Sequence, residues 1–480
     1  MSGEIPTSLG PLSNLLDLSN CSITGTLPKW LGSLMNLILL DLTNNHIEGP
    51  MPTFASSMSM LYLSDNMLSH LPSDIGHVMS SLGFLYVNRN LINGSIPDSL
   101  CKMQNLQILD LSKNHLSGNL PECWGNFDSL IVARLSSNHL SGAIPNSIGG
   151  AYRLQRLHLN NNSLTGQLPS NLKNCTRLEV LDVGDNKLSG KLPQWIGNDL
   201  LDLAALRLRN NSFYGDIPSL YCQLSKSQIM DLADNNLTGN IPHCFGNFSG
   251  MIDDGTTPGE FSLYMVFAEN SLWQTESFSV MMTGELREYE GMTSQYLVHL
   301  DLSNNHLVGN IPSELTILTR LMGLNLSHNH LRGRIPGKIG DMKSLVSLDL
   351  SSNKLSGTIP GSLSNLTFLS HLNLSNNDLS GQIPTGPQLQ TLNNPLIYEG
   401  NPGLCGDPLL KKCRINYETP PNVENDDDGD RADKMYLYAF IISGVATGFW
   451  GYFGVLVFKR SWRLALFRHM DSVIGRMLGR

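Results

Sequence analysis

Residues 109–118 read LDLSKNHLSG, and this phrase decides the fold because its pattern, LxLxxNxLxG, occurs thirteen times between Leu40 and Leu379. Nearly every copy begins 24 residues after the previous one. A fixed period of this length is typical of solenoids, in which each coil contacts only its neighbours. The asparagine at the place of Asn114 marks each copy, and the markers are Asn45, Asn66, Asn90, Asn114, Asn138, Asn162, Asn186, Asn211, Asn235, Asn305, Asn329, Asn353 and Asn377.

The spacing of the leucines predicts a parallel sheet. Side chains alternate along a strand, so the leucines of LxL point into the coil and the intervening residues point out. The marker asparagine should turn inward and hydrogen-bond the backbone of the neighbouring coil, because a buried amide without partners is costly. The following element, as at 116–121, predicts a turn at glycine and an edge strand or second short strand at proline.

The 24-residue repeat with LxGxIP, as at 355–360, resembles the plant-specific leucine-rich repeat of extracellular receptors and polygalacturonase-inhibiting proteins. The resemblance covers most of the chain up to about Gly406. It implies an α/β-type solenoid, a right-handed leucine-rich-repeat superhelix with a parallel concave sheet, to which the sequence adds one C-terminal transmembrane helix.

Two pairs of cysteines occupy equivalent places on adjacent repeats. In each pair one cysteine lies 11 residues after a marker asparagine, and the other lies 9 residues after the next marker. Neighbouring coils are close enough for disulfide geometry, and disulfides indicate an exported protein. The predicted disulfides are Cys101–Cys123 and Cys222–Cys244.

The other cysteines are less regular. Cys405 and Cys413 resemble the pair in the C-terminal cap of plant repeat ectodomains, which implies a third disulfide. Cys21 and Cys175 have no obvious partner. The alternative is that all eight cysteines are small buried hydrophobic residues.

Ten N-x-[ST] sequons agree with a secreted, glycosylated surface, although the repeat consensus is itself rich in Asn, Ser and Thr. The candidate glycosylation sites are Asn20, Asn93, Asn161, Asn174, Asn210, Asn236, Asn247, Asn325, Asn365 and Asn373.

The repeat phase is lost once, between Asn235 and Asn305, where 70 residues replace one ordinary step and leave an insertion of 46. This insertion is rich in aromatic residues, unlike a flexible linker, so we expect it to pack on the solenoid as an island. An island four repeats before the cap resembles the layout of plant receptor-like proteins. Members often carry Lys-Gly late in the island, whereas this chain has Thr283-Gly284.

A membrane segment is predicted at 435–458, which has 24 residues without a charge and is long enough to cross a bilayer. Basic residues follow it, so the C-terminus should face the cytoplasm and the repeats should lie outside. Small residues form a helix-packing face within it, at Gly444, Gly448, Gly451 and Gly454. In receptor-like proteins such a face resembles the docking surface for an adaptor receptor-like kinase, and the resemblance also implies a co-receptor kinase at the last repeats.

The predicted organisation follows the boundaries of these segments. It comprises a first block of repeats at 1–251, the island at 252–296, four repeats at 297–392, a C-terminal cap at 393–417, an acidic juxtamembrane linker at 418–434, the transmembrane helix at 435–458 and a short basic cytoplasmic tail at 459–480. The predicted location is the plasma membrane, as a single-pass type I protein. Residues 461–468 resemble the tails of receptor-like proteins of the xylanase-elicitor type.

The chain begins inside a repeat, at the sequence MSGEIP, with no charged region and apolar stretch of an export signal before it. We therefore expect either an N-terminally truncated product or fragment, or a product that is not exported efficiently.

No catalytic, metal or cofactor motif is found. The aspartates of the LDL phrases, such as Asp110 and Asp301, recur at one place in the repeat and belong to the consensus on the sheet surface. The formal charge of −9 and the lack of a basic stripe in the repeats argue against a nucleic-acid partner. The protein is therefore not expected to be an enzyme.

Recognition should use the concave face. Aromatic and arginine side chains, which are enriched at interface hot spots, depart from the Asp and Asn consensus at its outward positions, although ordinary variation of exposed positions is the alternative. The candidate ligand-binding residues are Tyr62, Phe84, Tyr86, Arg89, Arg134, Arg156, His158, Arg207 and Arg209.

These observations favour a receptor-like protein, most simply in plant defence, that binds an extracellular peptide, protein or carbohydrate elicitor and signals through a partner kinase. Three alternatives stay open: a developmental peptide receptor, a secreted inhibitor of cell-wall enzymes, and a non-functional truncated gene product. The membrane segment at 435–458 distinguishes the inhibitor, which needs none.

Overall fold

The computed structural model describes residues 14–252, 277–290 and 296–413. The predicted linker, membrane helix and tail, with the glycines of the helix-packing face, lie outside the described residues. Among the residues that are described, no helix has the length and apolar character needed to cross a membrane.

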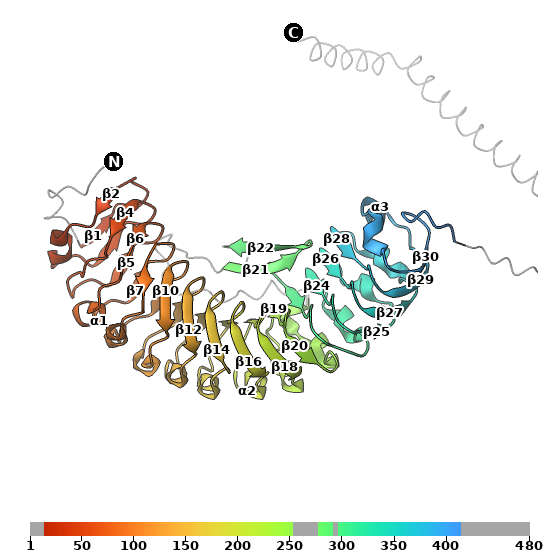
Figure 1. The fold of residues 1–480 in the computed structure, drawn as a ribbon, viewed down its shortest axis with the longest axis horizontal. Helices are drawn as coiled ribbons and strands as arrows, with labels where there is room; N and C mark the ends of the chain where they lie inside the picture. Colours follow the sequence, from red (N-terminus) through yellow and green to blue (C-terminus); the bar gives the residue numbers. More distant parts are fainter. Residues whose placement is uncertain (1–13, 253–276, 291–295, 414–480) are drawn as a thin grey trace, which may run out of the picture. The chain divides into compact units, whose positions relative to one another are not determined.

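In this part of the chain, one parallel sheet of fourteen strands lines the concave side of a stack of coils (Figure 1). Each strand carries one LxL phrase or a variant with another apolar residue, as the leucine spacing predicts, and neighbours pair in register, with Leu109 opposite Ala133, for example. The strands, in sheet order, are β1 (Leu15–Asp17), β3 (Leu39–Asp41), β5 (Met60–Tyr62), β7 (Phe84–Tyr86), β9 (Ile108–Asp110), β11 (Val132–Arg134), β13 (Arg156–His158), β15 (Val180–Asp182), β17 (Ala205–Arg207), β19 (Ile229–Asp231), β23 (His299–Asp301), β24 (Gly323–Asn325), β26 (Ser347–Asp349) and β28 (His371–Asn373).

The marker asparagines form the predicted ladder inside the stack. The Asn138 side chain donates to the carbonyl of Leu111 on the preceding coil at 3.1 Å, and its oxygen accepts from the backbone nitrogen of Leu116 at 2.9 Å. The leucines beside it, such as Leu135, are fully buried. Asn401 makes the same contacts in the cap, to Leu374 and Leu379, so the ladder extends one place beyond the thirteen repeats.

The LxG elements form a second set of short parallel strands along one side of the stack, as predicted for a second strand. They are β2 (Thr24–Thr26), β4 (His46–Gly49), β6 (Met67–Leu68), β8 (Asn93–Gly94), β10 (His115–Asn119), β12 (His139–Ala143), β14 (Ser163–Gly166), β16 (Lys187–Lys191), β18 (Ser212–Asp216), β20 (Asn236–Thr238), β25 (Arg332–Gly333), β27 (Lys354–Gly357), β29 (Asp378–Gln382) and β30 (Gly403–Cys405).

The convex side is built mainly from single 3-10 turns, so little α-helix accompanies the sheet. Most of these turns follow the proline of the repeat, which precedes the first turn residue in an extended conformation, as Pro145 does before Asn146–Gly150. The α-helices of the described residues are α1 (Ile75–Val78), α2 (Gln194–Asp199) and α3 (Pro387–Thr391). The 3-10 helices are Lys29–Ser33, Asp98–Lys102, Trp124–Asn126, Asn146–Gly150, Ser170–Asn174, Ser219–Gln223, His243–Asn247, Ser249–Met251, Ser313–Ile317, Ile339–Asp341, Gly361–Asn365 and Pro395–Tyr398.

The described part of the island is one β-hairpin, formed by β21 (Ser277–Met282) and β22 (Glu285–Glu290). Its turn is Thr283-Gly284, where both residues have positive φ, 55° and 80°. Two residues with positive φ match the twist of a tight hairpin. The hairpin lies over the concave sheet, with β21 nearer to the sheet than β22 (Figure 1).

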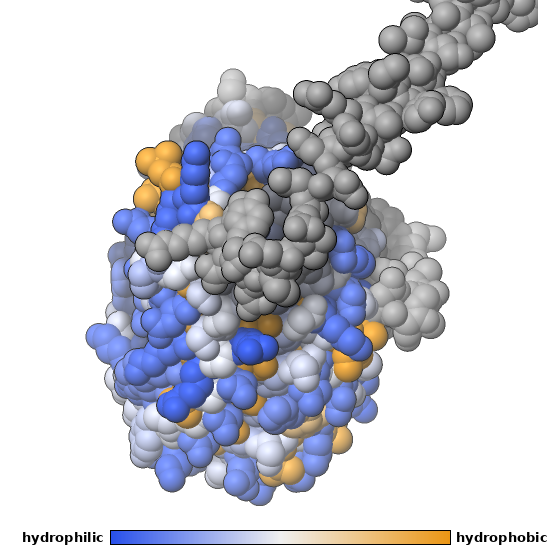
Figure 2. Space-filling view, turned by 90° about the vertical axis from the view of Figure 1, so that its right-hand side faces the viewer, coloured by the Kyte–Doolittle hydropathy of each residue, from blue (hydrophilic) through white to orange (hydrophobic). Residues whose placement is uncertain are grey.

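Three disulfides join the cysteine pairs Cys101–Cys123, Cys222–Cys244 and Cys405–Cys413. Cys21 and Cys175 are free, and Cys175 is buried in the core. The cap closes the stack at its C-terminal end, where the visible face is mostly hydrophilic with scattered apolar side chains (Figure 2). A polar end of this kind is what a terminal repeat requires.

Candidate functional site

The hairpin is attached to the concave sheet by a small apolar cluster. Alternate residues of β21, namely Phe278, Val280 and Met282, are at most 2% exposed and face one side of that strand. They pack on Val180 and Ala205 and on Ile229 at the first outward place of three adjacent strands. Burying apolar side chains of this size contributes about 1.5–3 kcal/mol each, so this cluster provides the main attraction between hairpin and solenoid.

The edge of β21 meets polar side chains of the sheet. Arg207 donates from Nη2 to the carbonyl oxygen of Ser279 at 2.7 Å, and His299 Nε2 contacts the carbonyl oxygen of Met281 at 3.0 Å. Because a carbonyl only accepts, His299 carries its proton on Nε2. These contacts satisfy backbone groups that an unpaired strand edge would otherwise leave exposed.

Beneath the hairpin, charged residues occupy the same outward place on adjacent strands. We call Asp182, Arg207, Asp231 and Asp301 the charged row. Each is 1% or 2% exposed. Arg207 lies between two carboxylates, with Nη1 2.5 Å from Asp182 Oδ2 and Nε 3.5 Å from Asp231 Oδ2. Arg209 adds contacts to Asp231 at 3.6 Å and to Asp234 at 2.9 Å.

Burial shifts the titration of this row. Loss of water raises the pKa of Asp231, opposed by Arg209 and Arg207. Loss of water, together with the charge of Asp231, raises the pKa of Asp301 to about 7. Burial, together with Arg207 and Arg209, lowers the pKa of His299 to about 3, so this imidazole is neutral. The row and Arg209 therefore place two arginines beside carboxylates whose protonated forms are favoured by burial.

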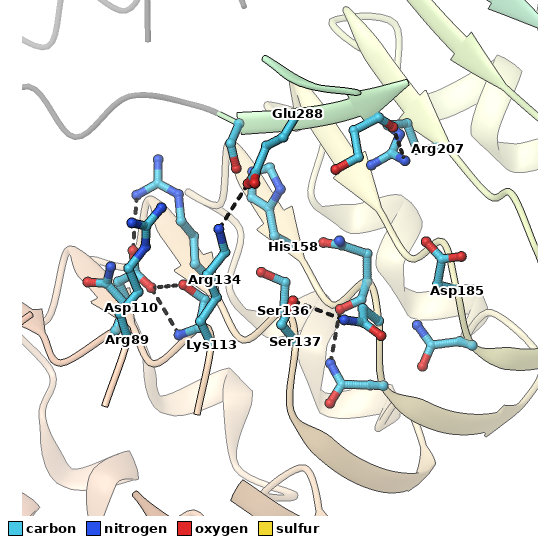
Figure 3. A pocket seen from close by; sticks show the side chains of 18 of the residues that line it. Arg89, Asp110, Lys113, Arg134, Ser136, Ser137, His158, Asp185, Arg207 and Glu288 are labelled. Atoms are coloured by element: carbon cyan, nitrogen blue, oxygen red, sulfur yellow. Dashed lines mark hydrogen bonds and ion pairs between the residues drawn. The ribbon is translucent and has the colours of Figure 1, made fainter. Parts of the chain in front are cut away.

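A cleft of about 720 Å³ opens beside the hairpin, between its polar side and the sheet. Figure 3 shows Glu288 of β22 directed toward Lys113, with a distance of 2.9 Å between Nζ and Oε1. This hydrogen bond to Lys113 lowers the pKa of Glu288. Among other residues, the cleft is lined by Arg89, Asp110, Arg134, His158 and Arg207. A volume in this range is typical of the clefts in which proteins bind small ligands.

The aromatic candidates form a separate cluster on earlier strands. Tyr62 and Tyr86 stack with ring centroids 5.0 Å apart and planes inclined by 13°. Phe84, Ile108 and Val132 complete this apolar cluster. Burial, followed by the charge of Asp41, raises the pKa of Tyr62 to about 12.

The nine predicted ligand residues thus separate into groups. Arg89, Arg134, His158 and Arg207 line the cleft, and the aromatic residues lie apart from it. Seven are at most 8% exposed, in contrast to the expectation of an exposed patch: Tyr62, Phe84, Tyr86, Arg156, His158, Arg207 and Arg209. Arg207 and Arg209 were expected to face solvent, but they pair with the buried carboxylates of Asp182 and Asp231, and Arg207 also donates to the hairpin. Arg156 is likewise buried and pairs with Glu179 at 3.0 Å.

The sequons differ in accessibility. Asn325 is 8% exposed, and its amide nitrogen donates to Asp301 and Ser303, so the folded protein does not present it for glycosylation. Asn373 lies half-buried at the same place of β28 and donates to Asp349. The exposed sequon residues are Asn20, Asn93, Asn161, Asn174, Asn210, Asn236, Asn247 and Asn365.

Sequence reasoning missed Lys113, Glu288 and the apolar attachment of the hairpin. A signal was present, because Val180, Ala205 and Ile229 are apolar at consecutive outward places. The island segment Ser277–Met282 also alternates polar and apolar residues, as a half-buried strand does. In the described residues no group of three His, Cys, Asp or Glu side chains is placed to hold a metal ion.

The sequence matches leucine-rich-repeat families. The description "Leucine rich repeat" applies to 56–116 and 319–379. Single leucine-rich repeats are matched at 14–34, 153–175, 177–198, 227–248 and 296–318.

Similar proteins include receptors from plants. "Receptor-like protein EIX2" of Solanum lycopersicum is 41% identical over 91 residues, 18% of this chain and 9% of that protein. The Arabidopsis receptor kinase HAESA, solved with the peptide hormone IDA and the co-receptor SERK1, is 31% identical with a TM-score of 0.65, covering 86% of this chain and 65% of HAESA. The plant peptide hormone receptor RGFR1, solved with RGF2, is 29% identical with a TM-score of 0.64, covering 82% and 60%. The chain thus spans less than two thirds of these relatives.

Proposed function

Because this chain belongs to the leucine-rich-repeat family, we propose that it is a non-enzymatic plant cell-surface receptor-like protein. Its ligand is an extracellular elicitor or peptide bound in the cleft beside the hairpin. The observation that carries the proposal is the cleft itself, in which charged side chains of the repeats and of the inserted hairpin converge. Similarity to receptors solved with peptide hormones supports a ligand of this kind.

The cleft offers paired charges instead of a catalytic set. Arg134 Nη1 lies 3.8 Å from Asp110 Oδ2, and Arg89 Nη1 lies 3.8 Å from Asp65 Oδ1. A ligand with its own charged groups can exchange for one partner of the exposed Arg89–Asp65 pair at little cost, since exposed pairs contribute roughly 0–1 kcal/mol. This arrangement supports recognition by charge and shape, without chemical change of the ligand.

The test compares two arginines in leaves that express the full chain. Arg134→Gln removes a cleft cation, and Arg177→Gln removes an exposed arginine from the outer surface of the coils. Fractions of fungal culture filtrate are the probe, and extracellular peroxide is the readout. We expect Arg134→Gln to raise the dose for a half-maximal response at least tenfold and Arg177→Gln to leave it unchanged. Equal responses of the two variants would contradict a role of the cleft in ligand recognition.

Signalling in this proposal passes laterally through the membrane segment 435–458 to a partner receptor-like kinase, because the chain shows no kinase signature of its own. Gly448→Leu should then abolish co-purification of the kinase, since a bulky residue prevents close helix approach. Release of the chain from membranes by carbonate would instead favour a secreted inhibitor of cell-wall enzymes.

A further inference from the structure

The second set of strands carries basic side chains near the C-terminal end of the repeats. We call this surface the lateral basic face, and it is formed by exposed residues of three adjacent repeats: His306, His330, Arg332, Arg334 and Lys354. They belong to the LxG elements, which include β25 and β27 at this point (Figure 1). The sequence contains no basic run here, because the face forms only when stacking brings together residues 22 and 24 positions apart.

Two cations of the lateral basic face lie directly opposite each other. Arg332 of β25 and Lys354 of β27 are register partners, on strands that run about 4.8 Å apart in such a sheet. Like charges in this arrangement destabilise a sheet. Arg334 adds a third cation one residue beyond β25, where its side chain lies beside Gly357 of the next repeat.

The protein supplies no counter-charge to these cations. Arg332, Arg334 and Lys354 form no ion pair with any residue that the structure describes. Asp378, the acidic residue on the neighbouring strand β29, has Ser356 as its register partner and likewise forms no ion pair within the described chain. Since the whole chain has a formal charge of −9, a cluster of cations without acidic partners is a local exception.

The lateral basic face lacks the anchors of a protein interface. Interfaces between proteins are centred on aromatic and other apolar residues. Here the side chains among the cations are small or polar, and they include Val308, Asn310, Ser356 and Thr358. His306 and His330 stack with ring centroids 5.8 Å apart. A hydrated polymer with repeated negative charges needs no apolar anchor, because charge-assisted hydrogen bonds hold it.

We propose that the lateral basic face binds a linear polyuronate, an acidic polysaccharide with a carboxylate on each sugar unit. The carboxylates replace the missing counter-charge of Arg332, Arg334 and Lys354, since a guanidinium pairs with a carboxylate through two parallel hydrogen bonds. The imidazoles donate to and accept from the sugar hydroxyl groups. No residue of this face lines the cleft, so the polymer attaches the protein to its surroundings without occupying the site of the proposed function.

The experiment measures binding of the detergent-solubilised full chain to immobilised polygalacturonate, with the methyl ester as the uncharged control polymer. We expect esterification to raise the dissociation constant at least tenfold, and salt to weaken binding, because exposed charges are screened. Arg332→Gln combined with Lys354→Gln should raise the dissociation constant about tenfold, since two charge-assisted contacts are lost. The same double variant should unfold at an equal or higher urea concentration, because a like-charge pair is removed.

Lys191→Gln is the matched control. Lys191 is exposed and has the same place in its repeat as Arg334, but its register partner on the next strand is the uncharged Tyr214. This variant should keep the wild-type affinity. Equal affinity of the wild type and the double variant, or equal binding of the polymer and its methyl ester, would overturn the proposal.

A second acidic probe separates polymer from protein. Binding of the wild type to succinylated serum albumin, an acidic protein, without binding to polygalacturonate would overturn the proposal in favour of a protein partner. Binding to polygalacturonate alone would support it. Because no elicitor is present and the cleft residues are unchanged, these outcomes are independent of whether the cleft recognises a ligand.

Discussion

The strands β3–β7 and β17–β23 are built from the same repeat but present different surfaces. On the first, Tyr62 and Tyr86 stack at the outward places. On the second, Arg207, Asp231 and Asp301 fill those places, and the hairpin packs on Ala205 and Ile229 of the same strands. The comparison teaches that the repeat sets where a side chain points, whereas its neighbours on adjacent coils and the inserted hairpin set its chemistry.

The largest effect should come from removing the cation of the covered region. Arg207→Met leaves Asp182 buried without its cation and removes one of the two arginines beside Asp231, so it should cost about 3–5 kcal/mol of unfolding free energy. Arg89→Met, beside the less enclosed region, breaks an exposed 3.8 Å pair with Asp65 and should cost about 1 kcal/mol or less. Urea unfolding of the two variants measures the contrast. Equal losses of unfolding free energy would mean that packing of the hairpin does not make the two regions differ in stability.

A smaller and more local effect is expected from the apolar attachment. Phe278 is 1% exposed and packs on the sheet, so Phe278→Ala should weaken docking of the hairpin by about 3 kcal/mol. Leu286→Ala is the control, because Leu286 is 55% exposed. Hydrogen exchange should show faster opening of 277–290 in the first variant only. Unchanged exchange in Phe278→Ala would contradict this apolar attachment.

The smallest effect should come from the exposed ion pair between Lys113 of the repeats and Glu288 of the hairpin. Lys113→Gln removes the pair with Glu288 and should cost about 1 kcal/mol or less, with less effect at high salt. Since Lys113 lowers the pKa of Glu288, this contribution is present at neutral pH and is lost as the pH falls below the ordinary glutamate value of 4.5.

Exchange of the β22 amides, measured at two salt concentrations, tests this prediction. Lys226→Gln provides a control, because it removes an exposed pair with Asp202 that does not contact the hairpin. A salt-independent loss in Lys113→Gln would show that Lys113 acts through packing instead of charge.

For much of the candidate site, the sequence predicts on which face a residue lies but not which residues it contacts. The concave position of Arg134 and His158 follows from their place between leucines. Their partners do not, because Lys113 and Glu288 are 175 residues apart and no period relates them. The burial of Arg207 and Arg209 was unpredictable for the same reason.

The sequence by itself determined the coils, the parallel sheet, the asparagine ladder and the pairing of cysteines on adjacent repeats, because each depends on contacts one 24-residue step away. Only the tertiary structure decided where the hairpin lies, which strands it packs on and which side chains of the repeats pair with it. These features depend on contacts between the island and distant coils, as between Arg207 and Ser279, and a periodic pattern carries no information about a segment that interrupts it.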